Sequence, residues 1–267
     1  MSTSSELRPG SFAYLVARLR RAQNAFSNIG LTDLMDFLIK SKLAPPKEDF
    51  HLKSRYAAFP LKCRAGSSDL DVFRQIYIQR EYRCLDHIEE PSLIVDCGAN
   101  VGFSAVYFLT RYPKARLIAI EPDPGNYKQL VENLKPFADR VDTILAAVWP
   151  SAKELVFTDF RDGREWSRSV RESTGGEAGS VAAIDMPGII ARAGVERIPL
   201  LKIDIEGAEA QLFAENTAAW LGKIDNMVVE LHDENCIRIF KDAIAPYGFQ
   251  TEECEELTVC TKPSARA

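Results

Sequence analysis

The first stretch that could do chemistry is LIVDCGANVGFSAVYF, residues 93–108, in which an apolar run leads into a turn with two glycines four positions apart. Gly98 can adopt backbone conformations that residues with side chains avoid, and Gly102 lets the chain approach a ligand closely. Asp96 closes the apolar run, within reach of a cationic or hydroxylated group. A helical pattern follows directly, so these residues predict a strand, a turn and a helix that together cradle a cofactor.

A second acid supports this cofactor site. Glu121 lies 25 residues after Asp96, in LIAIEPDPGNYKQL, and the carboxyl end of a neighbouring strand is suited to binding ribose hydroxyls. A dinucleotide-binding turn of the GxGxxG type would need glycine where this chain has Asn100 and Phe103. The pattern therefore disfavours a pyrophosphate, and a nicotinamide-dependent oxidoreductase is the weaker alternative.

A second group of ionisable residues closes two later apolar runs, LLKIDIEGAE and VVELHDE. Because side chains alternate along a strand, Lys202, Asp204 and Glu206 fall on one side of the first run. The second run brings Glu230 and His232 to its carboxyl end, where open α/β sheets bind ligands. Charged groups at the end of a buried strand are costly unless they are paired or functional, so we expect these residues to line a cleft. In the structural alternative, Lys202 neutralises Asp204 and Glu206 only begins a helix.

The elements that must position these residues alternate between apolar runs and helical patterns. This order predicts an α/β fold with a parallel sheet and helices on both faces, and the last two segments predict an antiparallel pair at the sheet edge. The predicted strands are 93–97, 116–121, 142–148, 181–184, 199–204, 226–231, 248–252 and 256–261. The predicted helices are 102–112, 124–135, 187–193, 207–216 and 234–245.

Helical patterns also precede the sheet. They predict an amphipathic helix over 11–26, a second helix over 31–43 that Pro45 and Pro46 end, and a helical segment over 69–90 that Asp69 caps. Between residues 151 and 179 the periodicity is lost, which predicts a hairpin and a mobile loop. The predicted organisation is an N-terminal helical extension over 1–46, a lead-in segment over 47–92 that covers the cofactor site, and a catalytic domain over 93–267.

Four stretches, VDCGANVGFSAVYF, IAIEPDPGNYKQLVENL, LLKIDIEGAEAQLF and VVELHDE, resemble the FkbM family of S-adenosylmethionine-dependent methyltransferases in sequence and in order. The resemblance runs from about Arg64 to Cys260. It implies a Rossmann-like class I methyltransferase fold, with a mostly parallel seven-stranded sheet and an antiparallel edge strand. It also implies S-adenosyl-L-methionine as the methyl donor and a hydroxyl of a sugar, glycolipid or secondary metabolite as the acceptor. The cofactor-binding positions that it implies are Asp96, Gly98, Asn100, Gly102, Glu121, Ala146 and Ala147.

Methyl transfer to a hydroxyl needs an acceptor oxygen held in line with the methyl group, exclusion of water and removal of the hydroxyl proton. A neutral imidazole is a natural base near pH 7, so we predict His232 as the catalytic base. Asp204 or Glu206 orients it or acts in its place. The same side chains could instead hold a divalent metal that acidifies the hydroxyl, and both versions stay open.

The composition limits the class of protein and its partners. The chain has 267 residues, of which 46% are hydrophobic and 27% charged, with a net charge of −5. These values predict a soluble folded protein, and the negative charge favours a small-molecule or glycan acceptor over nucleic acid. No apolar run approaches the roughly 20 residues of a membrane span, and the six cysteines form no CxxC pair, so we expect a cytoplasmic protein without stable membrane insertion.

The N-terminal helices are expected to dock on the main domain or to form a homodimer. A non-catalytic, cofactor-binding partner protein is a further alternative for the whole chain. The costly group of ionisable residues argues against it, because a pure binding module has no use for them.

Overall fold

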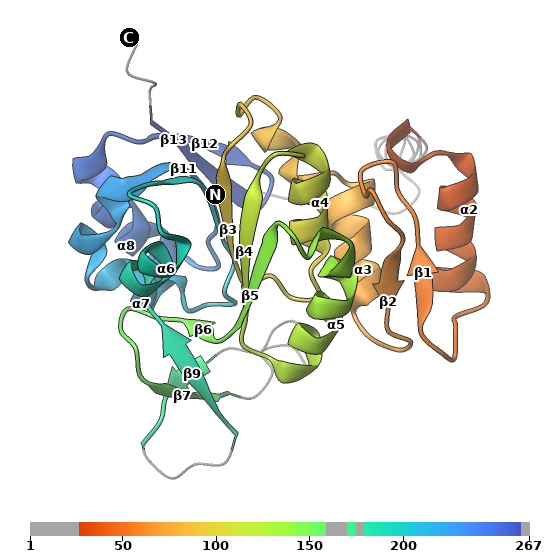
Figure 1. Cartoon of the computed structure of the whole chain (residues 1–267), viewed down its shortest axis with the longest axis horizontal. Coiled ribbons are helices and arrows are strands. Elements are labelled where there is room, and N and C mark those ends of the chain that lie inside the picture. Colours follow the sequence, from red (N-terminus) through yellow and green to blue (C-terminus); the bar gives the residue numbers. More distant parts are fainter. Residues whose placement is uncertain (1–26, 159–169, 175–178, 263–267) are drawn as a thin grey trace.

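A computed structural model describes residues 27–158, 170–174 and 179–262. Its central layer is a seven-stranded sheet with the strand order β12-β13-β11-β10-β3-β4-β5 (Figure 1). Strands β5, β4, β3, β10 and β11 pair in parallel, whereas β13 runs antiparallel to both of its neighbours. The bounds are β3 (Leu93–Cys97), β4 (Arg116–Glu121), β5 (Val141–Leu145), β10 (Ile198–Ile203), β11 (Ile224–Glu230), β12 (Gln250–Cys254) and β13 (Leu257–Thr261). The predicted α/β sheet is confirmed, with the antiparallel pair β12 and β13 at its edge.

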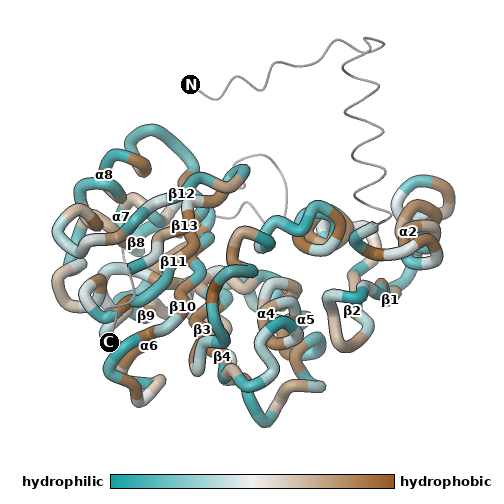
Figure 2. The backbone as a smooth tube through the Cα atoms, turned by 90° about the horizontal axis from the view of Figure 1, so that it is seen from above, coloured by the Kyte–Doolittle hydropathy of each residue, from teal (hydrophilic) through white to brown (hydrophobic). Residues whose placement is uncertain are grey.

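Helices cover both faces of this sheet (Figure 1). On one face lie α4 (Phe103–Arg111) and α5 (Pro124–Leu134), and on the other lie α6 (Met186–Ala193), α7 (Glu209–Ala214) and α8 (Glu234–Ile244). Strand β3 shows how the sequence builds two cores, because Ile94 packs into one apolar cluster while Leu93 and Val95 pack into the other. All three are buried, as expected of a parallel strand covered on both faces. Figure 2 shows the hydrophobic stretches running through β10, β3 and α4 in the middle of the molecule.

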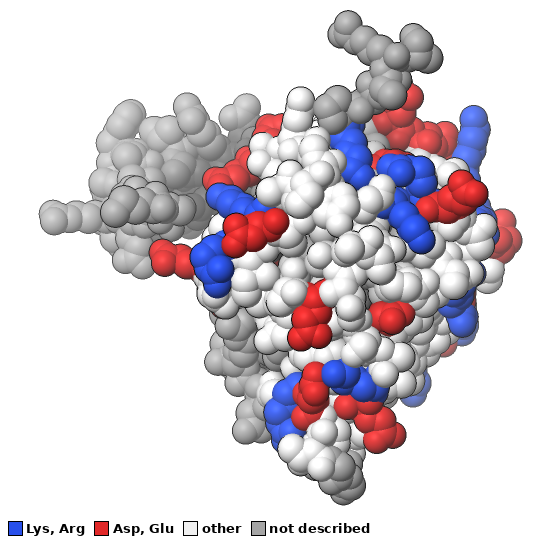
Figure 3. Space-filling view, turned by 90° about the vertical axis from the view of Figure 1, so that its left-hand side faces the viewer, with Lys and Arg blue, Asp and Glu red and all other residues white. Residues whose placement is uncertain are grey.

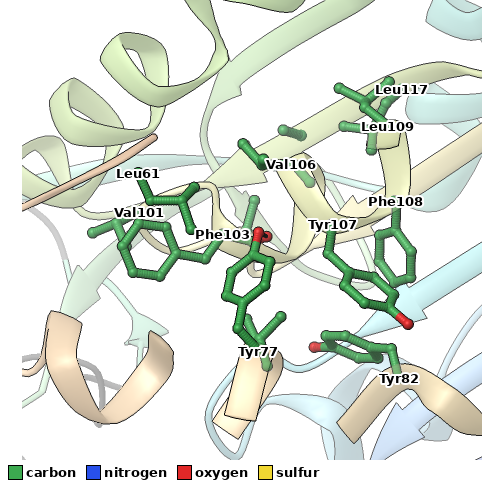
Figure 4. Close-up of a cluster of buried hydrophobic side chains, with 14 of the residues drawn as sticks. Leu61, Tyr77, Tyr82, Val101, Phe103, Val106, Tyr107, Phe108, Leu109 and Leu117 are labelled. Atoms are coloured by element: carbon green, nitrogen blue, oxygen red, sulfur yellow. Dashed lines mark hydrogen bonds between the residues drawn. The ribbon is translucent and has the colours of Figure 1, made fainter. Parts of the chain in front are cut away.

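The lead-in segment packs on the α4 and α5 side of the sheet. It contains a two-stranded antiparallel sheet, β1 (Phe50–Leu52) with β2 (Leu61–Cys63), and α3 (Asp69–Phe73). Figure 4 shows Tyr77 and Tyr82 lying against the aromatic residues of α4. The Tyr77 hydroxyl donates a hydrogen bond of 2.8 Å to the carbonyl of Phe103, so this segment is anchored at the first turn of α4.

The helical segment predicted over 69–90 is helical but not continuous. Helix α3 passes into a π-helical turn over 74–78, and a separate 3-10 turn covers 81–85. Arg80 breaks the run because it adopts a left-handed φ of 56°. The predicted cap is also wrong, since the buried Asp69 carboxylate accepts hydrogen bonds from the backbone and guanidinium of Arg64 rather than from its own helix.

The second predicted helix is confirmed as α2 (Leu31–Leu38), extended by a π-helical turn over 39–43. Its inner face joins the core through Phe37, which stacks on Phe73 at 5.7 Å between ring centroids. Its outer face exposes Leu31, Met35, Ile39 and Leu43. The helix predicted over 11–26 lies outside the described residues. The three-part division of the chain and the homodimer stay predictions.

A smaller, four-stranded sheet interrupts the simple alternation of strands and helices. Its order is β6-β9-β7-β8, with β6 (Ala147–Val148), β7 (Glu154–Phe157), β8 (Val170–Glu172) and β9 (Ser180–Ile184). The strand predicted over 142–148 therefore splits, because the chain leaves the main sheet at Ala146 and pairs with β9 instead. The predicted hairpin is confirmed as β7 with β8, while the mobile loop falls on 159–169 and 175–178, outside the described residues.

Among the described helices, none has both the length and the apolar character needed to cross a membrane. The face of the molecule shown in Figure 3 carries acidic and basic side chains interspersed rather than a basic surface. The expectation of a small-molecule or glycan acceptor stays a prediction.

Candidate active site

A cavity that opens to solvent lies where the main sheet meets the smaller one, and the empty space in it, open solvent included, is about 630 Å³. It forms at the carboxyl ends of β3, β4 and β10, the edge at which open α/β sheets bind ligands. The lining residues are Gly98, Asn100, Ile120, Glu121, Pro122, Asp123, Asn126, Ala146, Ala147, Val148, Phe157, Val170, Asp204, Ile205, Glu206 and Ala208.

The turn after β3 is held by the end of β4. The backbone N–H groups of Gly98 and Ala99 both donate to the carbonyl of Ile120, at 3.0 and 2.9 Å. Asn100 adopts a left-handed φ of 49°, which asparagine tolerates, and its N–H donates to Glu121 Oε2 at 2.9 Å. The turn and the acid are therefore one rigid unit, although 21 residues separate them in the sequence.

The two glycines of this turn serve different contacts. Gly98 has a φ of +81°, and a Cβ there would lie 1.7 Å from the carbonyl oxygen of Asp204. Gly98 is thus required by the close passage of the loop after β10. Gly102 has a φ of +85°, and its Cβ would face Leu130 of α5 at 3.3 Å. The close neighbour of Gly102 is thus a packed helix, and Gly102 lies outside the cavity lining, so its contact with a ligand stays a prediction.

Glu121 is the buried acid of the cavity wall. Its Oε1 accepts a hydrogen bond from the N–H of Asp123 at 3.0 Å, while Oε2 accepts the one from Asn100. Burial raises the pKa of Glu121 to about 7, against the lowering effect of these two backbone hydrogen bonds. The carboxylate can still accept further hydrogen bonds from a ligand, since each oxygen has two lone pairs.

Asp96 and Lys202 form a buried pair beneath the cavity. Lys202 Nζ lies 3.2 Å from Asp96 Oδ1 and 3.6 Å from Asp204 Oδ2, and it donates to the Gly98 carbonyl at 2.6 Å. Ser104 donates to the other Asp96 oxygen at 2.6 Å. Burial lowers the pKa of Lys202, but the charges of Asp96 and Asp204 outweigh it and hold that pKa above its usual value. Lys202 was predicted to line the cleft. It lies outside the cavity lining and instead contacts Asp96, Asp204 and the Gly98 carbonyl.

Carboxylates surround His232 beside the cavity. Glu209 Oε2 lies 3.4 Å from His232 Nδ1, and Glu206 Oε2 and Glu230 Oε1 lie 3.7 and 3.9 Å from Nε2. Glu209 is fully buried, and its oxygens accept hydrogen bonds from the N–H groups of Ile205 and Gly207. These bonds fix the loop between β10 and α7. Burial raises the pKa of Asp204 and Glu206, and it raises that of Glu230 to about 9.

The sequence model of the Methyltransferase FkbM domain matches residues 96–246, more than half of the chain. The chain belongs to the FkbM methyltransferase family. The match spans the cofactor turn, Glu121 and the whole carboxylate group, and it is narrower than the resemblance over 64–260. It also agrees with the fold, because the sheet is that of a Rossmann-like class I methyltransferase.

Three relatives of this FkbM methyltransferase illustrate the similarity. The AMB antimetabolite synthetase AmbE of Pseudomonas aeruginosa is 26% identical over 200 residues, which cover 61% of this chain and 9% of AmbE. The 2-O-methyltransferase NoeI of Sinorhizobium fredii is 30% identical over 179 residues, covering 61% of this chain and 70% of NoeI. The crystal structure of Methyltransferase FkbM from Methylobacillus flagellatus is 13% identical with a TM-score of 0.45, covering 93% of this chain and 60% of that one.

The FkbM methyltransferase brings most of its predicted site residues to one cavity. Those in the lining are Gly98, Asn100, Glu121, Ala146, Ala147, Asp204 and Glu206. The others lie outside the lining: Asp96 below it, Gly102 against α5, and His232 behind the carboxylates. The lead-in segment over 47–92 supplies none of the lining residues, so its covering role stays a prediction.

The carboxylates around His232 act against the neutral imidazole predicted for it, and its role as the catalytic base stays a prediction. Glu206 and Glu209, aided by the charge of Glu230, raise the pKa of His232 to about 11 against the opposing effect of burial. Without a bound cation, this raised pKa favours the imidazolium, which has no free lone pair with which to accept a proton. The sequence analysis also missed Glu209. Its only signal in the sequence is an acid three residues after Glu206, in the first turn of α7, where an acid is also expected for helix capping.

Proposed function

We propose that this FkbM methyltransferase transfers the methyl group of S-adenosyl-L-methionine to a hydroxyl oxygen. The observation that carries the proposal is one cavity with the buried carboxylate of Glu121 in one part of its wall and the partly exposed carboxylates of Asp204 and Glu206 in another. Gly98 connects these two parts of the wall. Its turn is hydrogen-bonded to the end of β4, and Gly98 itself lies against the loop after β10.

The lining fits an adenosyl group. Glu121 is placed to accept hydrogen bonds from ribose hydroxyls, which is the usual use of an acid at the end of this strand. Ala146, Ala147, Ile120 and Val148 give the cavity a wall of small and apolar side chains, which suits an adenine ring.

In catalysis, the bound sulfonium supplies a methyl group that is already activated toward attack by an oxygen. The protein therefore has to position the acceptor hydroxyl and take its proton. Glu206 and Asp204 present carboxylates at the cavity wall, so we assign them the binding of the hydroxyl and the acceptance of its proton. His232 Nε2 lies 3.7 Å from Glu206 Oε2 and helps to hold that carboxylate in place.

Oxygen as the methylated atom is supported by the relative NoeI, whose name records a 2-O-methyltransferase. Carboxylates at the reacting end also suit a hydroxyl, because they accept its hydrogen bond before the transfer. We extend the proposal to a small-molecule or glycan acceptor, methylated in the cytoplasm. All six cysteines are free, as is usual in a reducing compartment.

The turn after β3 does not support the alternative function of a nicotinamide-dependent oxidoreductase. Phe103, where a dinucleotide turn would need glycine, is buried against Tyr77 and Phe73 and is part of the core. Membership of a methyltransferase family also favours methyl transfer.

Calorimetry tests the donor directly. We expect S-adenosylhomocysteine to bind the full chain stoichiometrically and NADH not to bind. Transfer of radiolabelled methyl groups to a panel of hydroxylated sugars, with matched amino sugars as controls, then tests the acceptor atom. Binding of NADH without S-adenosylhomocysteine would refute the proposed donor, and labelling of amines alone would refute oxygen as the acceptor.

A further inference from the structure

Three side chains of the types that bind metals lie close together behind the cavity and come from three separate segments. Asp204 follows β10, Glu209 begins α7, and His232 follows β11. One ligand atom from each lies within 4.8 Å of the other two. We propose that Asp204, Glu209 and His232 bind a divalent cation. The binding stands on this geometry alone, whereas the role of the cation in the reaction rests on the proposed function.

Two buried polar atoms in this group have no hydrogen bond among the described residues. They are Asp204 Oδ1 and His232 Nδ1. Buried polar atoms are nearly always paired, so each such atom needs an explanation. Both belong to the same three residues, and a cation between them would satisfy both at once.

The balance of charge around these residues also favours a cation. Four carboxylates, those of Asp204, Glu206, Glu209 and Glu230, lie within 4.0 Å of His232 or Lys202. Lys202 is shared with Asp96, which it approaches more closely than Asp204. Burying like charges together is expensive unless an opposite charge compensates them. A divalent cation supplies that charge at the point where the carboxylates meet.

Further hydrogen bonds hold one of the three proposed ligands, Glu209, in position. The N–H groups of Ile205 and Gly207 hold both oxygens of Glu209, as partners of metal ligands commonly do, and lone pairs remain for a metal. Two carboxylates and one imidazole form a mixed oxygen and nitrogen set, which favours Mn²⁺ or Zn²⁺ over the all-oxygen preference of Ca²⁺.

The position of Asp204 connects the cation to the cavity. The Asp204 side chain is 26% exposed and belongs to the cavity lining. A cation bound to it therefore has coordination positions open toward the cavity. If the proposed function holds, the acceptor hydroxyl can occupy such a position and lose its proton more readily.

The test is titration of Mn²⁺ into the full chain after treatment with EDTA, followed by calorimetry and by the loss of the free Mn²⁺ signal in electron paramagnetic resonance. We expect one Mn²⁺ per chain. His232→Gln should weaken binding at least tenfold, and Asp204→Asn should do the same. Glu206→Gln is the matched control, because it removes a neighbouring carboxylate outside the three ligands and should change binding less than threefold.

Circular dichroism on each variant confirms that it is folded. The inference is overturned if the wild-type chain binds no Mn²⁺, or if Glu206→Gln and His232→Gln weaken binding equally, which would indicate diffuse attraction to negative charge. S-adenosylhomocysteine binding is measured on the same EDTA-treated protein. If it binds while Mn²⁺ does not, only the metal site is refuted, and the converse result refutes the proposed donor.

Discussion

A single residue of this site can have two roles, because it contacts residues that are distant in the sequence. Glu121 is the clearest case, because the same carboxylate that faces the cavity also holds the Asn100 turn through a hydrogen bond of 2.9 Å. Its burial leaves it half ionised near neutral pH, since its pKa is about 7. Ligand hydroxyls donate to the ionised form, so cofactor binding and proton release are linked at this residue.

This linkage predicts a pH-dependent affinity. Below pH 7 the Glu121 carboxyl is protonated and offers fewer acceptor sites, so S-adenosylhomocysteine affinity should fall roughly tenfold from pH 8 to pH 6. Glu121→Gln should bind more weakly at pH 8 by about 1 to 3 kcal/mol, and its affinity should be nearly independent of pH over this range. Calorimetry at several pH values measures both. Parallel pH profiles for the two proteins would remove Glu121 from ribose binding.

Gly98 and Gly194 should differ in how much a substitution by alanine lowers the free energy of unfolding. Gly98→Ala places a methyl group 1.7 Å from the Asp204 carbonyl oxygen, so we expect a loss of more than about 4 kcal/mol in the free energy of unfolding, or failure to fold. Gly194 is the matched control because its φ is +66° and no atom lies within 4 Å of an added Cβ. Gly194→Ala should cost only about 1 to 2 kcal/mol, from backbone strain. Equal losses in urea unfolding would contradict the close contact.

At the scale of elements, the carboxyl ends of β3, β4 and β10 lie next to one another and are also joined by hydrogen bonds. The turn after β3 bonds to Ile120 at the end of β4, and Asp204 N–H donates to the Cys97 carbonyl at 3.1 Å. Lys202 completes the connection by bonding to Gly98. The cofactor turn and the carboxylate group are therefore positioned by the same contacts.

Lys202→Met tests this connection. It leaves the buried Asp96 carboxylate without its nearest cation, so the free energy of unfolding should fall by about 3 to 5 kcal/mol. Adding Asp96→Asn removes the uncompensated charge and should restore part of the loss. Urea unfolding compares the two proteins. A single variant within 1 kcal/mol of the wild type, or a double variant less stable than the single one, would show that the pair does not hold the site.

At the scale of the whole molecule, the N-terminal helix α2 and the catalytic sheet share one core. Phe37 of α2 and residues of the sheet such as Leu117 and Val259 belong to the same buried cluster. Asn28, just before α2, also donates to the Ile78 carbonyl at 2.8 Å. The boundary predicted near residue 46 therefore separates segments that are packed together, and we expect them to unfold together.

Cooperative unfolding is the measurable consequence. Phe37→Ala should lower the stability by about 3 to 5 kcal/mol, because it leaves a cavity beside Phe73, and unfolding should remain a single transition. Leu43→Ala is the control, since Leu43 is 75% exposed, and it should cost less than about 0.5 kcal/mol. A small effect of Phe37→Ala, or a separate early transition, would make α2 an independent unit.

The local features of this protein could be predicted from its sequence. Strands β3 and β4 have the predicted bounds because a parallel strand buried on both faces is a continuous apolar run ended by turn residues. Gly98 and Glu121 could be found for the same reason, since each directly follows or closes such a run. The resemblance to FkbM methyltransferases added the donor and the roles of Ala146 and Ala147, which no spacing would reveal.

The remaining features depend on contacts between distant segments. Strand β6 is only two residues long and exists because β9 pairs with it, so no periodicity marks it. The charge of His232 depends on Glu206, Glu209 and Glu230, which the loop after β10, the start of α7 and the end of β11 bring together. Hydrophobic periodicity is a property of neighbours along the chain, whereas a pKa or a metal site is a property of neighbours in space. The residue types were therefore readable in the sequence, but the carboxylates that raise the pKa of His232, and the position of Glu209 beside it, depend on the tertiary structure.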